Sequence, residues 1–199
     1  MTGEMSLRER KKLATRLALS RAALRLAVEH GLDSLTPEAI AEAADVSPRT
    51  FRNYFSSKEE AIVAELQQRV TDIADALRSR PADEPIWQSL RAVVGTVIEP
   101  PRQEEHQIVA FMRLVKDNPA LLAQHLTVFE AMHQQLVELI AERTGTDARR
   151  DLYPGLLAAV SASCFKTALD MWSEGCSDAT LSDLIDDAFD QVSHGLPVP

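Results

Sequence analysis

Two helix starts that lie close together in the first third of the chain constrain its fold more than any other feature. Thr36-Pro37 and Ser47-Pro48 each place a hydroxyl side chain at the N-cap and a proline at the first helical position. Since the two starts are eleven residues apart, only about two turns of helix and a tight bend fit between them. This spacing predicts a helix-turn-helix, with short helices over residues 37–43 and 48–55.

Apolar residues at helical spacing predict helices through the rest of the chain. The predicted segments are 7–30, 58–80, 86–98, 103–117, 119–143, 147–174 and 179–194, with breaks at residues such as Gly31 and Pro100-Pro101. Pro154-Gly155 lies inside the segment 147–174 and should kink it or mark its true start. Because no alternating strand pattern occurs, the predicted fold class is all-α, with about nine helices.

The net charge of −9 is divided unevenly along the chain. Residues 1–58 carry ten Lys and Arg against seven Asp and Glu, while the remaining residues carry eleven against 23. Residues 8–25 alone hold seven basic side chains and one acid, Glu9. A basic N-terminal segment in an otherwise acidic chain indicates that an anionic polymer binds to the N-terminal segment. A solvated basic helix face explains the same charges, and charge alone leaves both interpretations open.

The second short helix has two chemically different faces. Phe51 and Phe55 are four residues apart and give it one buried face. Arg49 and Asn53 fall on the opposite side, where Arg can bind guanine through two hydrogen bonds and Asn can bind adenine in the same way. The segment therefore has the groups needed to read base edges in a major groove.

Further polar groups around this motif suit contacts with DNA phosphates. Lys58 lies beside the free amides at the start of the next helix, where Ser57 and Glu60 are expected to form a capping box. The predicted DNA-binding residues are Thr36, Ser47, Arg49, Thr50, Arg52, Asn53, Tyr54 and Lys58. The caps and aromatic residues of the motif also have ordinary roles in folding, to which DNA contact is added.

These motifs resemble the TetR family of transcription regulators. The resemblance covers residues 7–65 and rests on Thr36-x3-Ile40-Ala41-x2-Ala44-x-Val46-Ser47 and Tyr54-Phe55-x-Ser57-Lys58-Glu59. It implies a three-helix DNA-binding domain over 1–58, a helical ligand-sensing and dimerisation bundle over 59–199, and repression at a palindromic operator relieved by a small molecule. The chain departs from the family's pattern at Asp45, a turn position where glycine is common and φ is expected to be positive, and at Ser56, where many members carry proline.

The last two predicted helices carry wide apolar faces. In the segment 179–194 apolar residues recur at helical spacing, and the preceding helix interleaves small residues with larger apolar ones. Such faces can close a core within one chain or meet a second copy, and the sequence pattern leaves both open. The family resemblance implies the second, a four-helix dimer interface, with Phe165, Leu181, Ile185 and Phe189 as candidates.

A small-molecule effector needs a pocket in the C-terminal bundle. Methionine and aromatic side chains suit an adaptable apolar cavity, and an arginine suits an anionic group. The candidates are Trp87, Arg91, Phe111, Met112, Phe129, Met132 and Met171, each of which also fits an ordinary core or surface position. Residues 152–196 additionally resemble the subgroup of mycofactocin-type regulators, which implies a hydrophobic or acyl-CoA-like effector.

Other classes of function lack a pattern in this sequence. No H-E-x-x-H motif, glycine-rich phosphate loop, G-x-S-x-G elbow or cluster of Cys and His ligands occurs, so no enzyme, metal site or cofactor is predicted. Cys164 and Cys176 are expected to be free thiols in the cytoplasm. With no apolar run of about 18 residues, no membrane span is predicted. The remaining alternative is a helical protein-interaction module without sequence-specific DNA binding.

Overall fold

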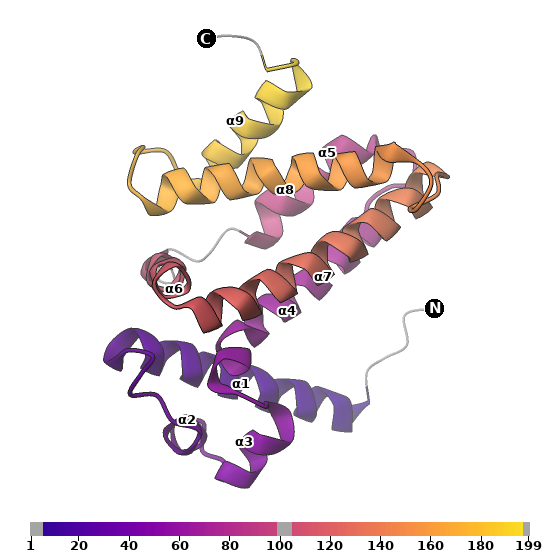
Figure 1. Cartoon of the computed structure of the whole chain (residues 1–199). Helices are drawn as coiled ribbons and strands as arrows, with labels where there is room; N and C mark the ends of the chain where they lie inside the picture. The colour runs from indigo at the N-terminus through magenta and orange to yellow at the C-terminus, as the bar shows by residue number, and fades with distance from the viewer. Residues whose placement is uncertain (1–5, 99–104, 197–199) are drawn as a thin grey trace. The chain divides into compact units, whose positions relative to one another are not determined.

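The computed structural model describes residues 6–98 and 105–196, and within them the chain forms nine α-helices and no strand (Figure 1). The predicted all-α fold is thereby confirmed. The helices are α1 (Leu7–His30), α2 (Pro37–Ala43), α3 (Pro48–Tyr54), α4 (Lys58–Ser79), α5 (Ile86–Ile98), α6 (Glu105–Asp117), α7 (Pro119–Thr144), α8 (Leu152–Ser173) and α9 (Leu181–Ser193). Pro100-Pro101, predicted to separate two helices, lies outside the described residues.

The chain divides into two compact units. The first contains Met1–Gln68 and His106–Val128, and the second contains Arg69–Glu105 and Phe129–Pro199. α4 and α7 each contribute one part to either unit. The predicted domain boundary after residue 58 falls at the first residue of α4 and stays a prediction.

The core of the first unit forms where α1 meets the helix-turn-helix and the start of α4. Leu19 of α1, Ile40 of α2, Phe51 of α3 and Ile62 of α4 are all buried. Small buried residues on α1, such as Ala23, let the neighbouring helices approach closely. This packing holds one face of α3 in the core and leaves its opposite face on the surface.

In the second unit α9 packs against α8 and α5. Phe189 of α9 is fully buried, and its ring centroid lies 4.6 Å from that of Trp87 on α5. The Trp87 indole N–H donates to the Ser193 hydroxyl at 2.6 Å, and the Cys164 thiol of α8 donates to the Ala188 carbonyl oxygen at 3.7 Å. Three helices thus close one core within a single protomer.

The connection between α4 and α5 is held by hydrogen bonds to its backbone. The Arg143 guanidinium of α7 donates to three carbonyl oxygens between Leu77 and Glu84, at 2.7–3.3 Å. The Glu84 carboxylate accepts from Arg80 and from the Ser89 hydroxyl. These bonds, with the one from Arg80 contributing most, lower the pKa of Glu84 to about 2.

α8 begins at Leu152, later than the predicted residue 147. Before it, Asp147 Oδ1 accepts hydrogen bonds from the backbone N–H groups of Arg149 at 2.8 Å and Arg150 at 3.1 Å, which shapes a turn. Pro154 is the third residue of α8, within the first turn, where a helix needs no backbone donor. Of the two predicted roles for Pro154-Gly155, marking the true start is confirmed.

Candidate DNA-binding interface

Hydroxyl side chains start both short helices of the motif. Thr36 Oγ1 accepts a hydrogen bond from the Ala39 N–H at 3.2 Å, and Ser47 Oγ accepts one from the Thr50 N–H at 3.1 Å. The proline after each cap occupies the start of the helix, where its missing N–H is not needed. The predicted caps are confirmed, and α2 and α3 are seven residues long each.

The turn between α2 and α3 depends on Asp45. Its φ is +54°, the left-handed conformation expected at this position. The Val46 N–H donates to the Ala41 carbonyl at 2.9 Å and the Asp45 N–H to the Glu42 carbonyl at 3.0 Å, which is a Schellman arrangement. An L side chain is disfavoured there by about 1–2 kcal/mol, and by less for Asp than for most residues. The turn therefore carries a modest strain that glycine would relieve.

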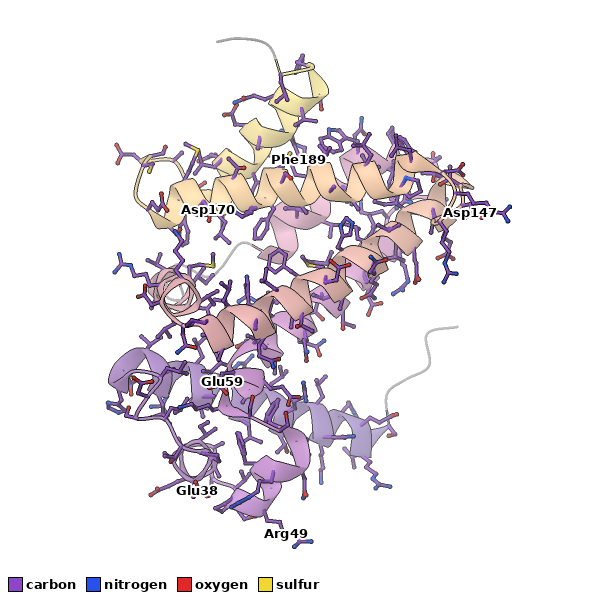
Figure 2. All side chains as sticks on the ribbon, viewed as in Figure 1. Glu38, Arg49, Glu59, Asp147, Asp170 and Phe189 are labelled. Carbon is purple, nitrogen blue, oxygen red and sulfur yellow. The ribbon has the colours of Figure 1, made fainter. Side chains whose placement is uncertain are left out.

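α3 presents the two faces that the sequence predicts. Phe51 and Phe55 are buried, with ring centroids 5.7 Å apart. Arg49 and Asn53 are exposed, and together with Arg52 they line a shallow surface hollow. Figure 2 shows the Arg49 side chain extending outward from α3, away from the other helices of the first unit. The outward orientation on which base reading depends is therefore confirmed.

The flanks of α3 are tied to their neighbours by weak surface contacts. Arg52 pairs with Glu38 of α2 at 3.1 Å, between two exposed side chains. Thr50 and Ser47 share a hydroxyl–hydroxyl hydrogen bond of 2.9 Å, and Tyr54 is half-buried. Because an exposed ion pair contributes about 1 kcal/mol or less, a phosphate can replace Glu38 as the partner of Arg52.

Lys58 has a structural role that the sequence did not predict. Its ammonium group donates to the carbonyl oxygens of Leu32 at 2.6 Å and Leu35 at 3.2 Å. The half-buried side chain thereby ties the start of α4 to the connection between α1 and α2. Only one of its three donors is left for the predicted phosphate contact, so Lys58 is primarily a residue that holds the motif together.

The capping box at the start of α4 is shifted by one residue from the prediction. Ser57 Oγ accepts from the Glu60 N–H at 3.0 Å, as predicted. The Glu60 carboxylate, however, accepts from the N–H and the hydroxyl of Ser56, at 2.8 and 2.7 Å. A proline, which many family members carry at this position, would have no N–H to donate. In this chain Ser56 holds the turn through hydrogen bonds instead.

Arg16 is a residue of this site that sequence reasoning missed. Its guanidinium donates to the Tyr54 carbonyl oxygen at 3.2 Å and to Gln67 Oε1 at 2.7 Å, and it lies 4.6 Å from the Phe55 ring centroid. It therefore joins α1, the C-terminal end of α3 and α4 in one contact. The signal in the sequence is its place on the apolar side of α1, three residues before the buried Leu19.

Three of the four candidates for the dimer interface lie inside the protomer, which counts against the role predicted for them. Leu181, Ile185 and Phe189 are at most 3% exposed, because the apolar stripe of α9 packs on α8 and α5. Phe165 of α8 is half-buried. A side chain without exposed surface has nothing to offer a second copy of the chain.

The apolar surface left uncovered in the second unit lies on α8 instead. Leu152, Tyr153, Leu156 and Met171 are 79%, 48%, 53% and 41% exposed. By length and composition alone α8 is long and apolar enough to cross a membrane, although no membrane span is predicted from the sequence, and one such helix is weak evidence. Only 28% of its most apolar stretch is buried within the protomer. The outer face of α8 therefore carries exposed apolar side chains at both of its ends.

The candidates for effector contact are divided between the two units. Phe111 and Met112 of α6 lie in the first unit, where the Phe111 ring packs edge-on against His125 at 5.7 Å. Burial lowers the pKa of His125, so the ring is neutral near pH 7. The candidates in the second unit are Trp87, Arg91, Phe129, Met132 and Met171.

Two candidates of the second unit already have structural partners. Trp87 is held against α9, as described above. The Arg91 guanidinium pairs with Asp186 at 2.6 Å and Asp190 at 2.5 Å, and the hydrogen bond with Asp186 contributes most to a raised pKa of Arg91. Both residues join α5 to α9, which weakens their case as effector ligands.

No group of three His, Cys, Asp or Glu side chains in residues 6–98 and 105–196 is placed to hold a metal ion. Cys164 is buried and Cys176 exposed, and both are free thiols. Burial raises the pKa of the Cys164 thiol, so it is not a reactive thiolate at neutral pH. The outward face of α3 remains the strongest candidate site.

Two family models and a close relative match the chain. Residues 19–65 match the bacterial regulatory proteins of the tetR family, and residues 84–197 match the MftR C-terminal domain. The transcriptional regulator TcmR of Streptomyces glaucescens is 36% identical over 172 residues, which are 83% of this chain and 76% of TcmR. The chain belongs to the TetR family. The tetR match contains α2 and α3, so this TetR-family protein is a transcription regulator with a DNA-binding helix-turn-helix.

Other TetR-family proteins share the architecture over nearly the whole chain. MftR of Mycobacterium tuberculosis, a regulator ascribed to mycofactocin biosynthesis, is 23% identical over 187 residues, 94% of this chain and 93% of MftR. The structure of Thermus thermophilus FadR, a TetR-family repressor in complex with lauroyl-CoA, has a TM-score of 0.60 at 23% identity and covers 92% of this chain and 96% of FadR. The predicted family, with an MftR-like C-terminal half, is confirmed over the alternative of an interaction module without DNA binding.

Proposed function

We propose that this protein is a homodimeric repressor that binds a palindromic operator through α3 and leaves it when a small molecule binds. One observation supports the proposal above all others. α3 exposes Arg49 and Asn53 while Phe51 and Phe55 hold its opposite face in the core. The exposed pair has the donors and acceptors for guanine and adenine edges in the major groove. The neighbouring Arg52, Thr50 and Tyr54 supply phosphate contacts that set the register.

Dimerisation is part of the proposal because a seven-residue helix reads too few base pairs to find one site in a genome. Two copies on a two-fold axis read two half-sites about 34–36 Å apart, or a multiple of that. The exposed apolar side chains of α8, among them Leu152 and Leu156, form the surface best suited to the second copy. A dimer interface also accounts for an apolar helix that is mostly uncovered in the protomer, in a protein that works on DNA in the cytoplasm.

The DNA part of the proposal is tested by selecting duplexes from a random pool with the purified protein and measuring affinities by fluorescence anisotropy. Arg49→Ala should weaken binding to the selected site by about 1–3 kcal/mol and relax base preference at one position per half-site. Arg149→Ala is the matched control, because Arg149 is exposed in the connection between α7 and α8. Equal losses for Arg49→Ala on the selected site and on random duplex would contradict the assigned role.

We propose a hydrophobic or acyl-CoA-like molecule as the effector. One comparison supports this class: the fold shared with a FadR that was crystallised with lauroyl-CoA. Within the second unit, the half-buried side chains of Phe129 and Met132 on α7 are the remaining apolar candidates for contact.

The effector class is tested with lauroyl-CoA, with CoA alone as the control. Lauroyl-CoA should raise the unfolding temperature and release the selected duplex, because a ligand that binds one arrangement better shifts the population toward it. CoA alone should do neither at the same concentration. If lauroyl-CoA leaves both readouts unchanged, this effector is wrong and the DNA-binding part of the proposal is unaffected.

A further inference from the structure

We propose that the first two turns of α1 form a second DNA-binding surface, which contacts the phosphate backbone of duplex that flanks the bases read by α3. This surface, the α1 basic turns, consists of Arg8, Arg10, Lys11 and Lys12. It rests on the proposed function, since it extends the same protein–DNA contact. The residues lie outside the segment 19–65 that matches the tetR family model.

The four cations of the α1 basic turns are available for an external partner. All four are exposed, and no ion pair or hydrogen bond joins their side chains to another residue in the described part of the chain. The nearby acid, Glu9, is committed to the helix cap: its carboxylate accepts from the Ser6 N–H at 2.8 Å and its own N–H donates to Ser6 Oγ at 3.2 Å. These bonds to Ser6 lower the pKa of Glu9. Glu9 thus offsets one positive charge and leaves a net positive surface.

Helix stability does not explain cations at this position. The N-terminus of a helix is the positive end of its dipole, where acidic residues stabilise and basic residues destabilise the helix by about 0.3–1 kcal/mol each. α4 and α9 follow this rule, with Glu59 and Glu60 in the first turn of α4 and Asp183 in that of α9. α1 also has an acid in its first turn, Glu9, but it adds Arg8 and Arg10 to that turn and Lys11 and Lys12 to the next. The dipole disfavours the two cations of the first turn, and an anion beside the cluster would offset that cost.

The contact made by Arg16 places the α1 basic turns beside the reading helix. Because Arg16 donates to the Tyr54 carbonyl, the N-terminal half of α1 passes the C-terminal end of α3 (Figure 1). Lys12 and Arg8 come four and eight residues before Arg16, which puts them about 6 and 12 Å further along the helix axis and on a similar side of it. A duplex held in contact with α3 continues past the end of that helix, within reach of these long side chains.

The phosphate backbone is the partner that this surface fits best. Lysine and arginine without planar partners act mainly as positive charges, and duplex DNA carries one negative charge per about 1.7 Å of its axis. Each phosphate that is neutralised releases bound counterions, so these contacts raise affinity without selecting a sequence. The surface therefore raises the affinity for binding sites that have duplex on either side. Base preference depends on Arg49 and Asn53.

The test compares the selected duplex, trimmed to the bases between the outer ends of its half-sites, with the same duplex extended by eight random base pairs on each side. The variant is Arg8→Ala/Lys12→Ala. The control is Arg149→Ala/Arg150→Ala, which removes the same charge from an exposed connection in the second unit. Affinities are measured by anisotropy between about 50 and 300 mM salt, and folding is followed by thermal unfolding.

Wild-type protein and control should bind the extended duplex more tightly than the trimmed one, and the variant should lose most of that gain, on the order of tenfold near 100 mM salt. With two cations lost per copy and two copies per site, the salt slope on the extended duplex should fall by up to about 3.6. The variant's unfolding temperature should stay the same or rise, because cations have been removed from a helix N-terminus.

Several outcomes would overturn this inference. If the variant loses the same affinity on trimmed and extended duplex, or loses no more affinity than the control, these cations act only through overall charge. A changed sedimentation coefficient of the free variant would mean that the surface binds a second copy of the chain. Wild-type protein that binds the trimmed duplex but gains nothing from flanks refutes the α1 surface alone, whereas failure to select any duplex refutes the proposed function itself.

Discussion

The proposed position of the dimer surface is tested most directly by comparing Phe189 with Leu156. Phe189 is fully buried between α9, α8 and α5, whereas Leu156 on the outer face of α8 is 53% exposed. If the outer face of α8 meets a second copy, Leu156→Asp should separate folded protomers. Phe189→Ala should instead destabilise the protomer itself, because it removes a side chain from the core.

The structure gives the expected magnitudes. Truncating a fully buried Phe costs about 3–5 kcal/mol, a large part of the roughly 5–15 kcal/mol that stabilises a typical domain. Burying a whole Leu side chain contributes about 1.5–3 kcal/mol, so covering its exposed half contributes about 1 kcal/mol per copy and about 2 per dimer. At about 1.4 kcal/mol per factor of ten, Leu156→Asp should raise the dimer dissociation constant at least tenfold, and the introduced carboxylate adds to that.

Urea unfolding and analytical ultracentrifugation distinguish the two effects. Leu156→Asp should sediment as a monomer that still unfolds cooperatively, while Phe189→Ala should shift the unfolding midpoint strongly. Leu126→Asp is the matched control, because Leu126 on α7 is 59% exposed and receives the same substitution on a different helix. A cooperative, stable monomer from Phe189→Ala, or an intact dimer from Leu156→Asp at low micromolar concentration, would refute the reasoning.

Three further predictions follow from single contacts. Arg16→Ala should lower the free energy of unfolding by about 2 kcal/mol, because it removes charged hydrogen bonds to α3 and α4. Arg16→Lys should recover part of that loss. An unchanged urea midpoint for Arg16→Ala would contradict the prediction. Asp45→Gly should raise the unfolding temperature by relieving about 1 kcal/mol or less of backbone strain, and should tighten DNA binding by removing a negative charge beside α3; a lower unfolding temperature would count against it. Glu84→Gln should be less stable than wild-type protein at pH 7. Because the pKa of Glu84 falls from 4.5 to about 2 on folding, this difference is full above pH 4.5 and shrinks as the pH falls toward 2, and urea midpoints at pH 7, 4.5 and 3 would show whether it does.

The helix-turn-helix could be predicted from the sequence because its signals are local. A hydroxyl residue followed by proline defines a helix start within three or four residues, and both predicted caps are present at Thr36 and Ser47. The outward position of Arg49 follows from the buried position of Phe51, two residues away on a helix of known period. Each of these inferences needs no knowledge of distant parts of the chain.

The roles of Lys58 and Arg16 could not be predicted in the same way. Each donates to backbone carbonyl oxygens: Lys58 to those of Leu32 and Leu35, and Arg16 to that of Tyr54, 38 residues away. Every residue has a carbonyl group, so the sequence carries no sign of which ones are left without a partner at the end of a helix. Sequence reasoning therefore assigned Lys58 to a phosphate contact, and it overlooked the contact that Arg16 makes with the Tyr54 carbonyl oxygen.

The apolar stripe of α9 shows where a hydrophobic pattern stops being informative. Periodicity establishes that one face of a helix is removed from water, but it does not say whether the same chain or a second copy removes it. On α9 the apolar stripe is buried within the protomer, and Phe189 has no exposed surface. On α8 the inward face is equally buried, yet Leu152 and Leu156 still project from the other side, so its apolar residues exceed what one protomer can cover. A helix that is apolar on more than one face is thus a stronger sign of assembly than a clean stripe, because a clean stripe can be satisfied by a single core.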